Sequence, residues 1–326
     1  MPRSSDSIDV RLISKVSLLY YHHELTQQEI ADRLNLSRPK VSRLLKQARK
    51  QGIIQISVSF PNGNFVDLES RLEKKFNLKE ALIVEAEIPD RSAGGRALKQ
   101  QLGTAGAEYL HRTVSEGDTI GVTWGTTLQA MMEVMHPKPT RNTNVVQTLG
   151  GVGPPEARAH AVDIARRLSQ LLDSRLTLLP APGIVDHKEA KQVLLSDRRV
   201  KEAFKLFSKI NTLYVGIGAL STNPVLVRES HEITDELLRD ILKSYAVGDI
   251  GLNFFDEAGK KAGTVLHDLI IGMTFEELKN VETVVGIAGG EEKFKSILGA
   301  LRGQLIDVLI TDHQTADRLL MNEERN

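Results

Sequence analysis

The chain has 326 residues, 41% hydrophobic and 26% charged, which is typical of a folded protein of about two domains rather than a disordered one. It contains no cysteine, which excludes disulfide bonds, thiolate metal sites and cysteine nucleophiles. The net charge of zero is unevenly distributed, because residues 1–60 carry ten Lys or Arg and five Asp or Glu. A basic head on an acidic body favours a nucleic acid as partner of the head, although such an excess also occurs as ordinary surface charge.

No apolar run approaches the roughly 20 residues that span a bilayer. The first ten residues are polar and acidic and lack the apolar segment of a secretory signal. We therefore expect a cytoplasmic protein that does not enter a membrane.

The head has the spacing of a helix-turn-helix. Apolar residues recur at helical intervals between Arg11 and Tyr21, and Thr26 with Glu29 forms a capping box before a second helix over residues 27–34. Asn35 suits the tight turn that follows, and Ser37 is expected to cap a third helix that ends at Gly52. The residues expected to pack the two helices together are Ile30, Ala31, Leu34, Leu36, Val41, Leu44, Leu45 and Ala48.

The other face of the third helix is polar and basic, as in a recognition helix that enters the major groove of DNA. The candidates for base readout are Arg38, Lys40, Ser42 and Arg43, and those for phosphate contacts are Ser37, Lys46, Arg49 and Lys50. The alternative is a helical hairpin with a solvated basic face, or one that binds another protein. Residues 53–60 alternate apolar and polar positions, which predicts a short strand or wing.

Three segments follow from these patterns: a winged helix-turn-helix domain over residues 1–60, a linker and connector helix over 61–78, and an effector and oligomerisation domain over 79–326. The helical pattern between Phe65 and Asn77 fits either a connector that pairs with a second copy or the first helix of the body.

The body alternates apolar strands with amphipathic helices, which predicts an α/β fold with a mostly parallel, doubly wound sheet. The expected strands are 81–85, 119–123, 144–149, 175–179, 212–216, 249–255, 283–288 and 307–311. The expected helices are 96–113, 156–172, 188–208, 235–245 and 291–305, with a further helix around Leu128 to Met132.

Two strand ends carry glycine-rich turns that open a helix, at residues 121–127 (GVTWGTT) and 286–293 (GIAGGEEK). Free backbone N–H groups at a helix start, hydroxyls and a lysine favour an anion such as phosphate. In an open parallel sheet such loops meet at the carboxyl ends of the strands, where ligands bind. Neither turn has the dinucleotide or Walker pattern, which disfavours NAD and ATP.

Catalytic patterns are weak, because the chain has neither a nucleophile-elbow motif nor a paired-histidine zinc helix. We expect no catalytic residues, no metal and no cofactor. An enzyme would need a general base beside the site, and Asp249 and Glu257 are the candidates.

Together, the helix-turn-helix over 27–48, GVTWGTT, LLPAPG (178–183), GIG (216–218), VGDI (247–250) and GIAGGEEK resemble the SorC family of bacterial sugar-responsive transcriptional regulators, in order and spacing over nearly the whole chain. The resemblance implies a winged helix-turn-helix joined to an effector domain related to sugar-phosphate isomerases and CoA transferases. It also implies a homo-oligomer, a dimer or tetramer, on operator DNA, with a sugar, sugar phosphate or polyol as effector.

By the family's motifs, Gly125, Thr126 and Thr127 would hold the phosphate end of the effector. Asp249 would accept hydrogen bonds from sugar hydroxyls, and Lys293 would contact phosphate or sugar oxygens. The chain departs from some phosphosugar-binding members, which place an arginine where this chain has Gln147 and Thr148. This difference leaves room for a less charged effector.

The first hypothesis is therefore an effector-controlled regulator, a repressor or an activator, of an operon for carbohydrate or polyol use. The second is a sugar-phosphate isomerase or CoA-transferase-like enzyme that carries a DNA-binding head. Turnover of a sugar phosphate would distinguish the two.

Overall fold

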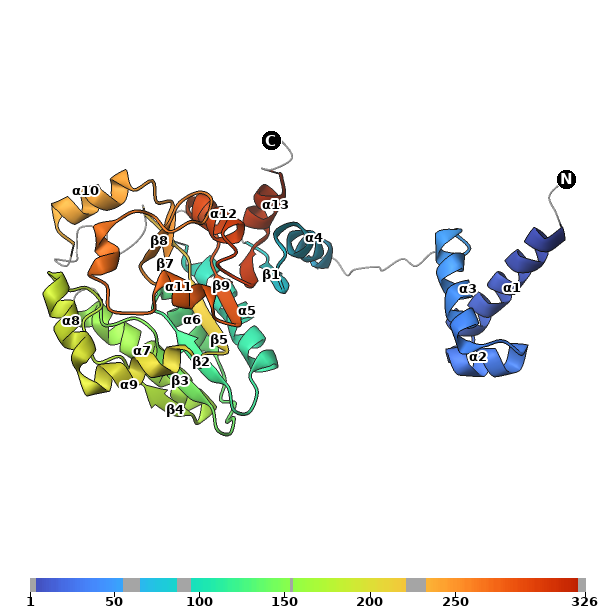
Figure 1. The fold of residues 1–326 in the computed structure, drawn as a ribbon, viewed down its shortest axis with the longest axis horizontal. Helices are drawn as coiled ribbons and strands as arrows, with labels where there is room; N and C mark the ends of the chain where they lie inside the picture. Colours follow the sequence, from blue (N-terminus) through green and yellow to red (C-terminus); the bar gives the residue numbers. More distant parts are fainter. Residues whose placement is uncertain (1–3, 55–64, 87–94, 153–154, 221–232, 322–326) are drawn as a thin grey trace. The chain divides into compact units, whose positions relative to one another are not determined.

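The computed structural model describes residues 4–54, 65–86, 95–152, 155–220 and 233–321 (Figure 1). The chain divides into two compact units, Met1–Asn62 and Gly63–Asn326, called here the head and the body. None of the described helices is long and apolar enough to cross a membrane.

The head consists of α1 (Ser4–Tyr21), α2 (Gln27–Leu34) and α3 (Arg38–Lys50). Its core joins one face of each helix, and the fully buried members include Ile13, Ile30 and Val41. The three helices and their core confirm the predicted helix-turn-helix. The predicted wing falls on residues 53–60, of which 55–60 lie outside the described residues.

Local hydrogen bonds explain why α2 begins and ends where the sequence predicts. Thr26 Oγ1 accepts from Glu29 N, and Glu29 Oε2 accepts from Thr26 N at 2.8 Å, which completes the capping box. Asn35 ends α2 in the left-handed conformation, with φ of 56°. Ser37 differs from the expectation, because it occupies the N-cap position of α3 but its side chain makes no cap hydrogen bond. Its hydroxyl is left exposed.

The body is built on a seven-stranded sheet in the order β1-β10-β9-β5-β2-β3-β4, and every neighbouring pair is parallel. The strands are β1 (Glu80–Val84), β2 (Thr119–Val122), β3 (Asn144–Gln147), β4 (Arg175–Thr177), β5 (Thr212–Gly216), β9 (Thr283–Ile287) and β10 (Val308–Asp312). The expected parallel α/β architecture is therefore confirmed.

Helices cover both faces of this sheet, as in a doubly wound fold (Figure 1). One face packs on α5 (Arg96–Thr113), α6 (Thr126–Val134) and α7 (Pro155–Leu172). The other packs on α4 (Val66–Phe76), α9 (Arg198–Phe207), α12 (Phe294–Arg302) and α13 (His313–Met321). It also carries α8 (Lys188–Ser196), α10 (Asp235–Lys243), η1 (Val265–Asp268), α11 (Phe275–Lys279) and a small antiparallel sheet of β6 (Gly218–Ala219), β7 (Gly248–Ile250) and β8 (Asn253–Phe255).

Three predicted elements are each divided in two. The strand expected over 249–255 is the hairpin β7–β8, because Gly251 and Leu252 both adopt positive φ and turn the chain back. The helix expected over 188–208 breaks at Asp197, whose carboxylate accepts from Arg199 N and Val200 N and starts α9. The helix expected over 291–305 starts as a 3-10 turn, η2 (Glu291–Lys293), and α12 follows.

Helix α4 belongs to the body and lies against β1, the edge strand of the sheet (Figure 1). Glu73 Oε1 accepts from Ala81 N at 3.0 Å, and Glu69 Oε1 accepts from Ile83 N at 2.9 Å. Lys75 Nζ donates to the last carbonyls of α13, Leu319 O and Leu320 O. Between the two options that the sequence left open, the structure thus places this helix as the first helix of the body.

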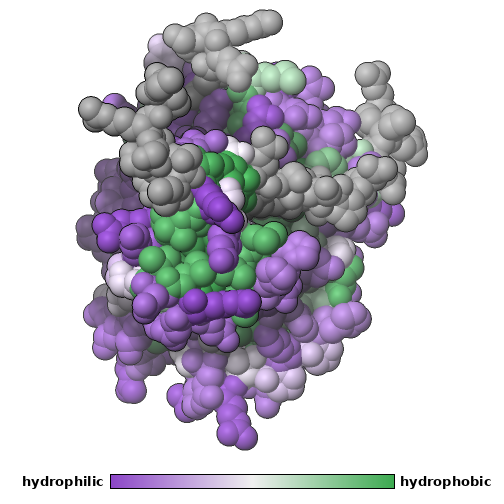
Figure 2. Space-filling view, turned by 90° about the vertical axis from the view of Figure 1, so that its right-hand side faces the viewer, coloured by the Kyte–Doolittle hydropathy of each residue, from purple (hydrophilic) through white to green (hydrophobic). Residues whose placement is uncertain are grey.

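Most of the surface drawn in Figure 2 is hydrophilic, with apolar residues gathered in one area of that face. Among the described residues, the most exposed large apolar side chains are Tyr245, Val193, Met321 and Leu242. Single exposed apolar side chains are common on protein surfaces.

Candidate functional site

The first candidate site is the outer face of α3 in the head. Five of the six residues proposed to contact DNA, namely Ser37, Arg38, Lys40, Arg43 and Lys46, are exposed, and Ser42 is half-buried. Helix α3 contains no acidic residue. It therefore presents an unbroken basic face, which fits the phosphates and base edges of DNA.

Arg49, a further candidate for phosphate contact, has a partner within the head. Its guanidinium donates to Tyr21 Oη from Nε at 3.1 Å and from Nη2 at 2.7 Å. This pair joins the end of α3 to the end of α1, so Arg49 has a structural role that its sequence position did not indicate.

The second candidate site lies at the carboxyl ends of β2 and β5, the point where the sheet reverses its winding. After β2 the chain passes through α6 to β3 on one side, whereas after β5 it passes through β6–β8 to β9 on the other. Thr123 N donates to Tyr214 O at 3.2 Å, and this hydrogen bond joins the ends of β2 and β5. Open α/β sheets bind ligands in the crevice at such a reversal.

The turn from β2 into α6 supplies a helix N-terminus to this crevice. Gly125 is the N-cap with φ of 149° and ψ of 151°, a conformation that a side chain would strain. Thr126 is exposed and Thr127 is buried, and no side chain of the described residues caps α6. The first N–H groups of the helix therefore face the crevice end of β2, which is a favourable arrangement for an anion.

The turn from β9 into α12 carries Lys293, which is half-buried. Burial, and to a lesser extent the positive charge of Lys99, lower the pKa of the Lys293 ammonium to about 8, although Asp249 and Glu292 act in the opposite direction. At neutral pH the side chain remains charged for most of the time. A desolvated ammonium near a second lysine is stabilised by any anion that binds there.

Asp249, on β7, is buried and has a structural partner. Its Oδ2 accepts from Leu252 N at 3.0 Å and so holds the β7–β8 turn. Gly248 brings β7 against α12, because a Cβ on Gly248 would lie 2.5 Å from Ser296 Cβ. This close packing places Asp249 within electrostatic range of Lys293.

Gln147 ends β3 and is only 3% exposed. Its Nε2 donates to Leu149 O at 2.7 Å, which fixes the orientation of the amide. Its Oε1 has no hydrogen-bond partner among the described residues. Since a buried acceptor without a donor is costly, a hydroxyl donor from a bound molecule would stabilise this side chain.

The structure therefore places Asp249 within electrostatic range of Lys293, whereas Gly125, Thr126 and Thr127 follow β2, which β5 separates from β9. Their loops approach each other where Gly251 packs against Thr123, since a Cβ on Gly251 would lie 3.2 Å from Thr123 Cγ2. The other proposed base, Glu257, accepts through its carbonyl from Arg302, at the end of α12 opposite Lys293. Helix α12 separates the two by about 13 Å.

Lys99 is a residue of this site that the sequence analysis missed. It lies in the first turn of α5, where Leu98 packs beside Gly290. A single lysine early in an amphipathic helix has no sequence signal that separates it from a solvated surface lysine. Among the described residues, no cluster of His, Asp and Glu has the arrangement of a metal site.

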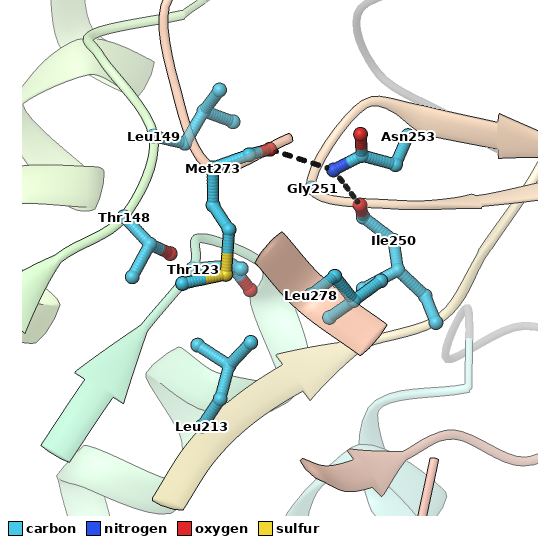
Figure 3. Close-up of a pocket in the computed structure, with 9 residues that line it drawn as sticks. All are labelled: Thr123, Thr148, Leu149, Leu213, Ile250, Gly251, Asn253, Met273 and Leu278. Atoms are coloured by element: carbon cyan, nitrogen blue, oxygen red, sulfur yellow. Dashed lines mark hydrogen bonds between the residues drawn. The ribbon is translucent and has the colours of Figure 1, made fainter. Parts of the chain in front are cut away.

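A small cavity lies under the β7–β8 hairpin, on the face of the sheet opposite to α6 (Figure 3). Thr123, Thr148, Leu213 and Met273 are among its lining residues, and Asn253 Nδ2 closes it by donating to Ile250 O and Met273 O. Its volume of about 10 Å³ suffices for one water molecule and not for a sugar. The small size of this cavity shows that the hairpin packs closely onto the sheet, and a sugar does not fit inside it.

Comparison with known proteins agrees with the division of the chain into a head and a body. Residues 16–61 match a "Crp-like helix-turn-helix domain", and residues 61–321, most of the chain, match a family described as "Putative sugar-binding domain". The full-length sorbitol operon regulator SorC from Klebsiella pneumoniae has a similar structure, with a TM-score of 0.71 and 29% identity over 96% of this chain and 99% of that one. The chain belongs to the SorC family.

Two relatives resemble the chain over nearly its full length. The deoxyribonucleoside regulator of Bacillus subtilis is 34% identical, covering 96% of this chain and 98% of its own. The sorbitol operon regulator of Klebsiella pneumoniae is 30% identical, covering 97% and 99%. As a SorC-family protein, the chain is a DNA-binding transcriptional regulator with a sugar-binding domain, which confirms the first hypothesis and leaves the enzyme hypothesis without support.

The buried charge of Lys293 predicts a measurable cost in stability. Replacing Lys293 by Met should raise the free energy of unfolding at pH 7 by about 1 kcal/mol, or the melting temperature by about 2–4 °C, because a desolvated charge is removed. In the original chain the folded-state pKa is about 8 and the reference value is 10.5, so the unfolded state binds more protons between these values and stability rises with pH there. The Lys293→Met variant should lose this rise.

Lys295→Met is the matched control, because Lys295 is an exposed lysine two residues away. Chemical denaturation between pH 7 and 10.5 provides the measurement for both variants. The same pH dependence in both would show that Lys293 is not desolvated in the folded chain.

Proposed function

We propose that this SorC-family regulator controls an operon for the use of a carbohydrate or polyol, and that a sugar, sugar phosphate or polyol binds in the crevice of the body. The observation that carries the proposal is that Asp249 lies within electrostatic range of Lys293, while α6, whose N-cap Gly125 has no side chain, starts at the end of β2. A carboxylate, an ammonium and free N–H groups supply the acceptors and donors that a hydroxyl-rich molecule needs. The names of the relatives, a sorbitol operon regulator and a deoxyribonucleoside regulator, support this class of molecule.

The charges favour a particular orientation of the effector. The positive end of α6, with Thr126 and Thr127, and the Lys293 ammonium suit a phosphate or another anionic group. The Oε1 of Gln147, which has no hydrogen-bond partner among the described residues, suits a hydroxyl donor and disfavours an anion. We therefore infer an effector whose anionic end, where it has one, lies toward α6 and α12 and whose hydroxyls lie toward β3.

The body is proposed to sense its ligand without converting it. Of the two candidate bases, Asp249 already holds the β7–β8 turn and Glu257 lies beyond the far end of α12. A sensor needs only that the ligand binds one arrangement of the protein better than another, which shifts the population that binds DNA. A sugar phosphate incubated with the protein should be recovered unchanged.

We also propose that the chain acts in the cytoplasm as a dimer or tetramer. Two-fold symmetric operators are bound by paired heads whose spacing matches the helical repeat of DNA. Light scattering of the purified chain should give a mass at least twice 36.1 kDa, and a monomer at micromolar concentration would contradict the proposal.

A base contact by α3 predicts the effect of changing Arg43. The Arg43→Ala variant should lose about 1–3 kcal/mol of specific binding to an operator fragment, because a bidentate contact to a base is removed. Arg43→Lys is the control: it keeps the charge and should keep the non-specific affinity while losing discrimination between sequences. Fluorescence anisotropy at fixed salt measures both. Unchanged affinity in Arg43→Ala would favour a protein-binding role for the head.

Ligand-dependent unfolding tests the effector site directly. A phosphosugar, free sugar or polyol at 100 times its dissociation constant should stabilise the chain by about 2.7 kcal/mol, or roughly 5–10 °C. If only phosphorylated compounds act, Lys293→Ala should abolish the shift. If only neutral compounds act, the phosphate role of Thr126 and Thr127 is wrong and Gln147→Leu should abolish the shift instead. A panel without any response would contradict the proposed effector class.

A further inference from the structure

Asp312 is a buried carboxylate to which the proposed function gives no role. It ends β10 and is 1% exposed. Its Oδ1 accepts from Thr315 N at 2.9 Å, and its Oδ2 accepts from Thr315 Oγ1 at 2.7 Å and from Gly290 N at 2.7 Å. A buried carboxylate requires donors of this kind, so Asp312 and the backbone of Gly290 hold each other in place.

The segment held by Asp312 is the turn that carries Lys293, here called the ligand loop (residues 289–293). Gly289 lies against the carboxylate, since a Cβ there would be 2.4 Å from Asp312 Oδ2, and Gly290 has φ of 95°. Lys293 N donates to Gly290 O at 3.0 Å and closes the turn. A ligand that draws Lys293 toward itself therefore acts directly on the hydrogen bonds of Asp312.

The next residue, His313, contacts the segment after β1 and the residue before α4. Its Nδ1 accepts from Ala86 N at 2.9 Å, just beyond the end of β1. Its ring stacks on Phe65, with ring centroids 5.5 Å apart and planes 5° from parallel. Phe65 O accepts from Glu69 N at 2.9 Å and starts α4. Residues 55–64 connect Phe65 to the head, so Phe65 stands where the chain leaves the body.

The rest of α4 is fixed by hydrogen bonds to neighbouring elements. Glu69 and Glu73 bind the edge of β1, and Lys75 binds the last turn of α13. At its start, Phe65 stacks on the His313 ring and packs against the core of the body. A shift of His313 therefore acts on the start of α4 directly, through this ring stack.

We propose that Asp312 and His313 link the ligand loop to Phe65, so that ligand binding at Lys293 changes the point where the chain leaves the body for the head. The function of this link rests on the proposed effector-controlled binding of DNA. Asp312 and His313 are positioning residues, because neither is assigned a contact with ligand or DNA. If the two are coupled, a change in the ligand loop must produce a measurable change at Phe65, and the reverse.

Hydrogen exchange of the full chain tests the link without any ligand. In Asp312→Asn, amide exchange should rise by about tenfold in the ligand loop and also at Ala86 and in the first turn of α4, while β2 stays protected. Thr315→Val removes one hydroxyl from the same network and should give the same pattern more weakly, in case the first variant folds poorly.

The control is Asp307→Asn, which removes a similar bond at the opposite end of β10, where Asp307 Oδ2 accepts from Val284 N at 2.8 Å. It should change exchange near residue 284 and leave the first turn of α4 unaffected. Phe65→Leu should act in reverse and raise exchange in the ligand loop, because coupling is reciprocal. A rise confined to the ligand loop in Asp312→Asn, or a uniform rise throughout the body, overturns the proposal.

Binding to a duplex that the original chain selects from a random DNA pool tests the consequence. The dissociation constant should change by at least about threefold in Asp312→Asn and Phe65→Leu and remain constant in Asp307→Asn. If the rise in amide exchange reaches the first turn of α4 but the dissociation constant for DNA does not change, the link exists without a regulatory role. If the original chain selects no duplex, the proposed function fails, whereas the exchange experiment still decides whether the link exists.

Discussion

The reversal of winding between β5 and β2 is the constraint on which the body depends. Because the connections after these strands leave in opposite directions, no crossover helix in the described part of the chain closes over their carboxyl ends. The β2–α6 turn follows directly from β2, and β6, which pairs with β7, follows directly from β5. The Lys293 turn follows β9, which is adjacent to β5. The crevice therefore follows from strand order, and the side chains around it adjust what it binds.

The same region shows a conflict between stability and binding. Lys293 is a partly desolvated charge near Lys99, and the buried Oε1 of Gln147 receives no hydrogen bond from the residues that the structure describes. Each costs free energy in the empty protein, and each is relieved by a ligand with the matching group. Binding sites commonly keep such locally unfavourable groups, because the relief on binding contributes to affinity.

Sequence reasoning succeeded where a local pattern determines the structure. The capping box of Thr26 and Glu29 and the left-handed Asn35 follow from hydrogen bonds within a few residues, and parallel strands follow from apolar runs between helices. It failed where a distant partner decides. The run from Asp249 to Phe255 alternates polar or small residues with apolar ones, as a half-buried strand does, and so does not reveal its turn. Lys99 and Asp312 gain their roles only from Lys293 and Gly290. No pattern in the sequence places those residues side by side.

The bonds from α4 to β1 have a consequence for how copies of the chain meet. An edge strand with unsatisfied N–H groups is a template for strand addition and aggregation. Here the N–H groups of Ala81 and Ile83 are already occupied by the carboxylates of Glu73 and Glu69, two side chains one helical turn apart. Sheet extension across the β1 edge is therefore blocked within a single chain, so a second copy that meets this edge does so through side-chain surfaces, which sequence changes can tune without disturbing the backbone of the sheet.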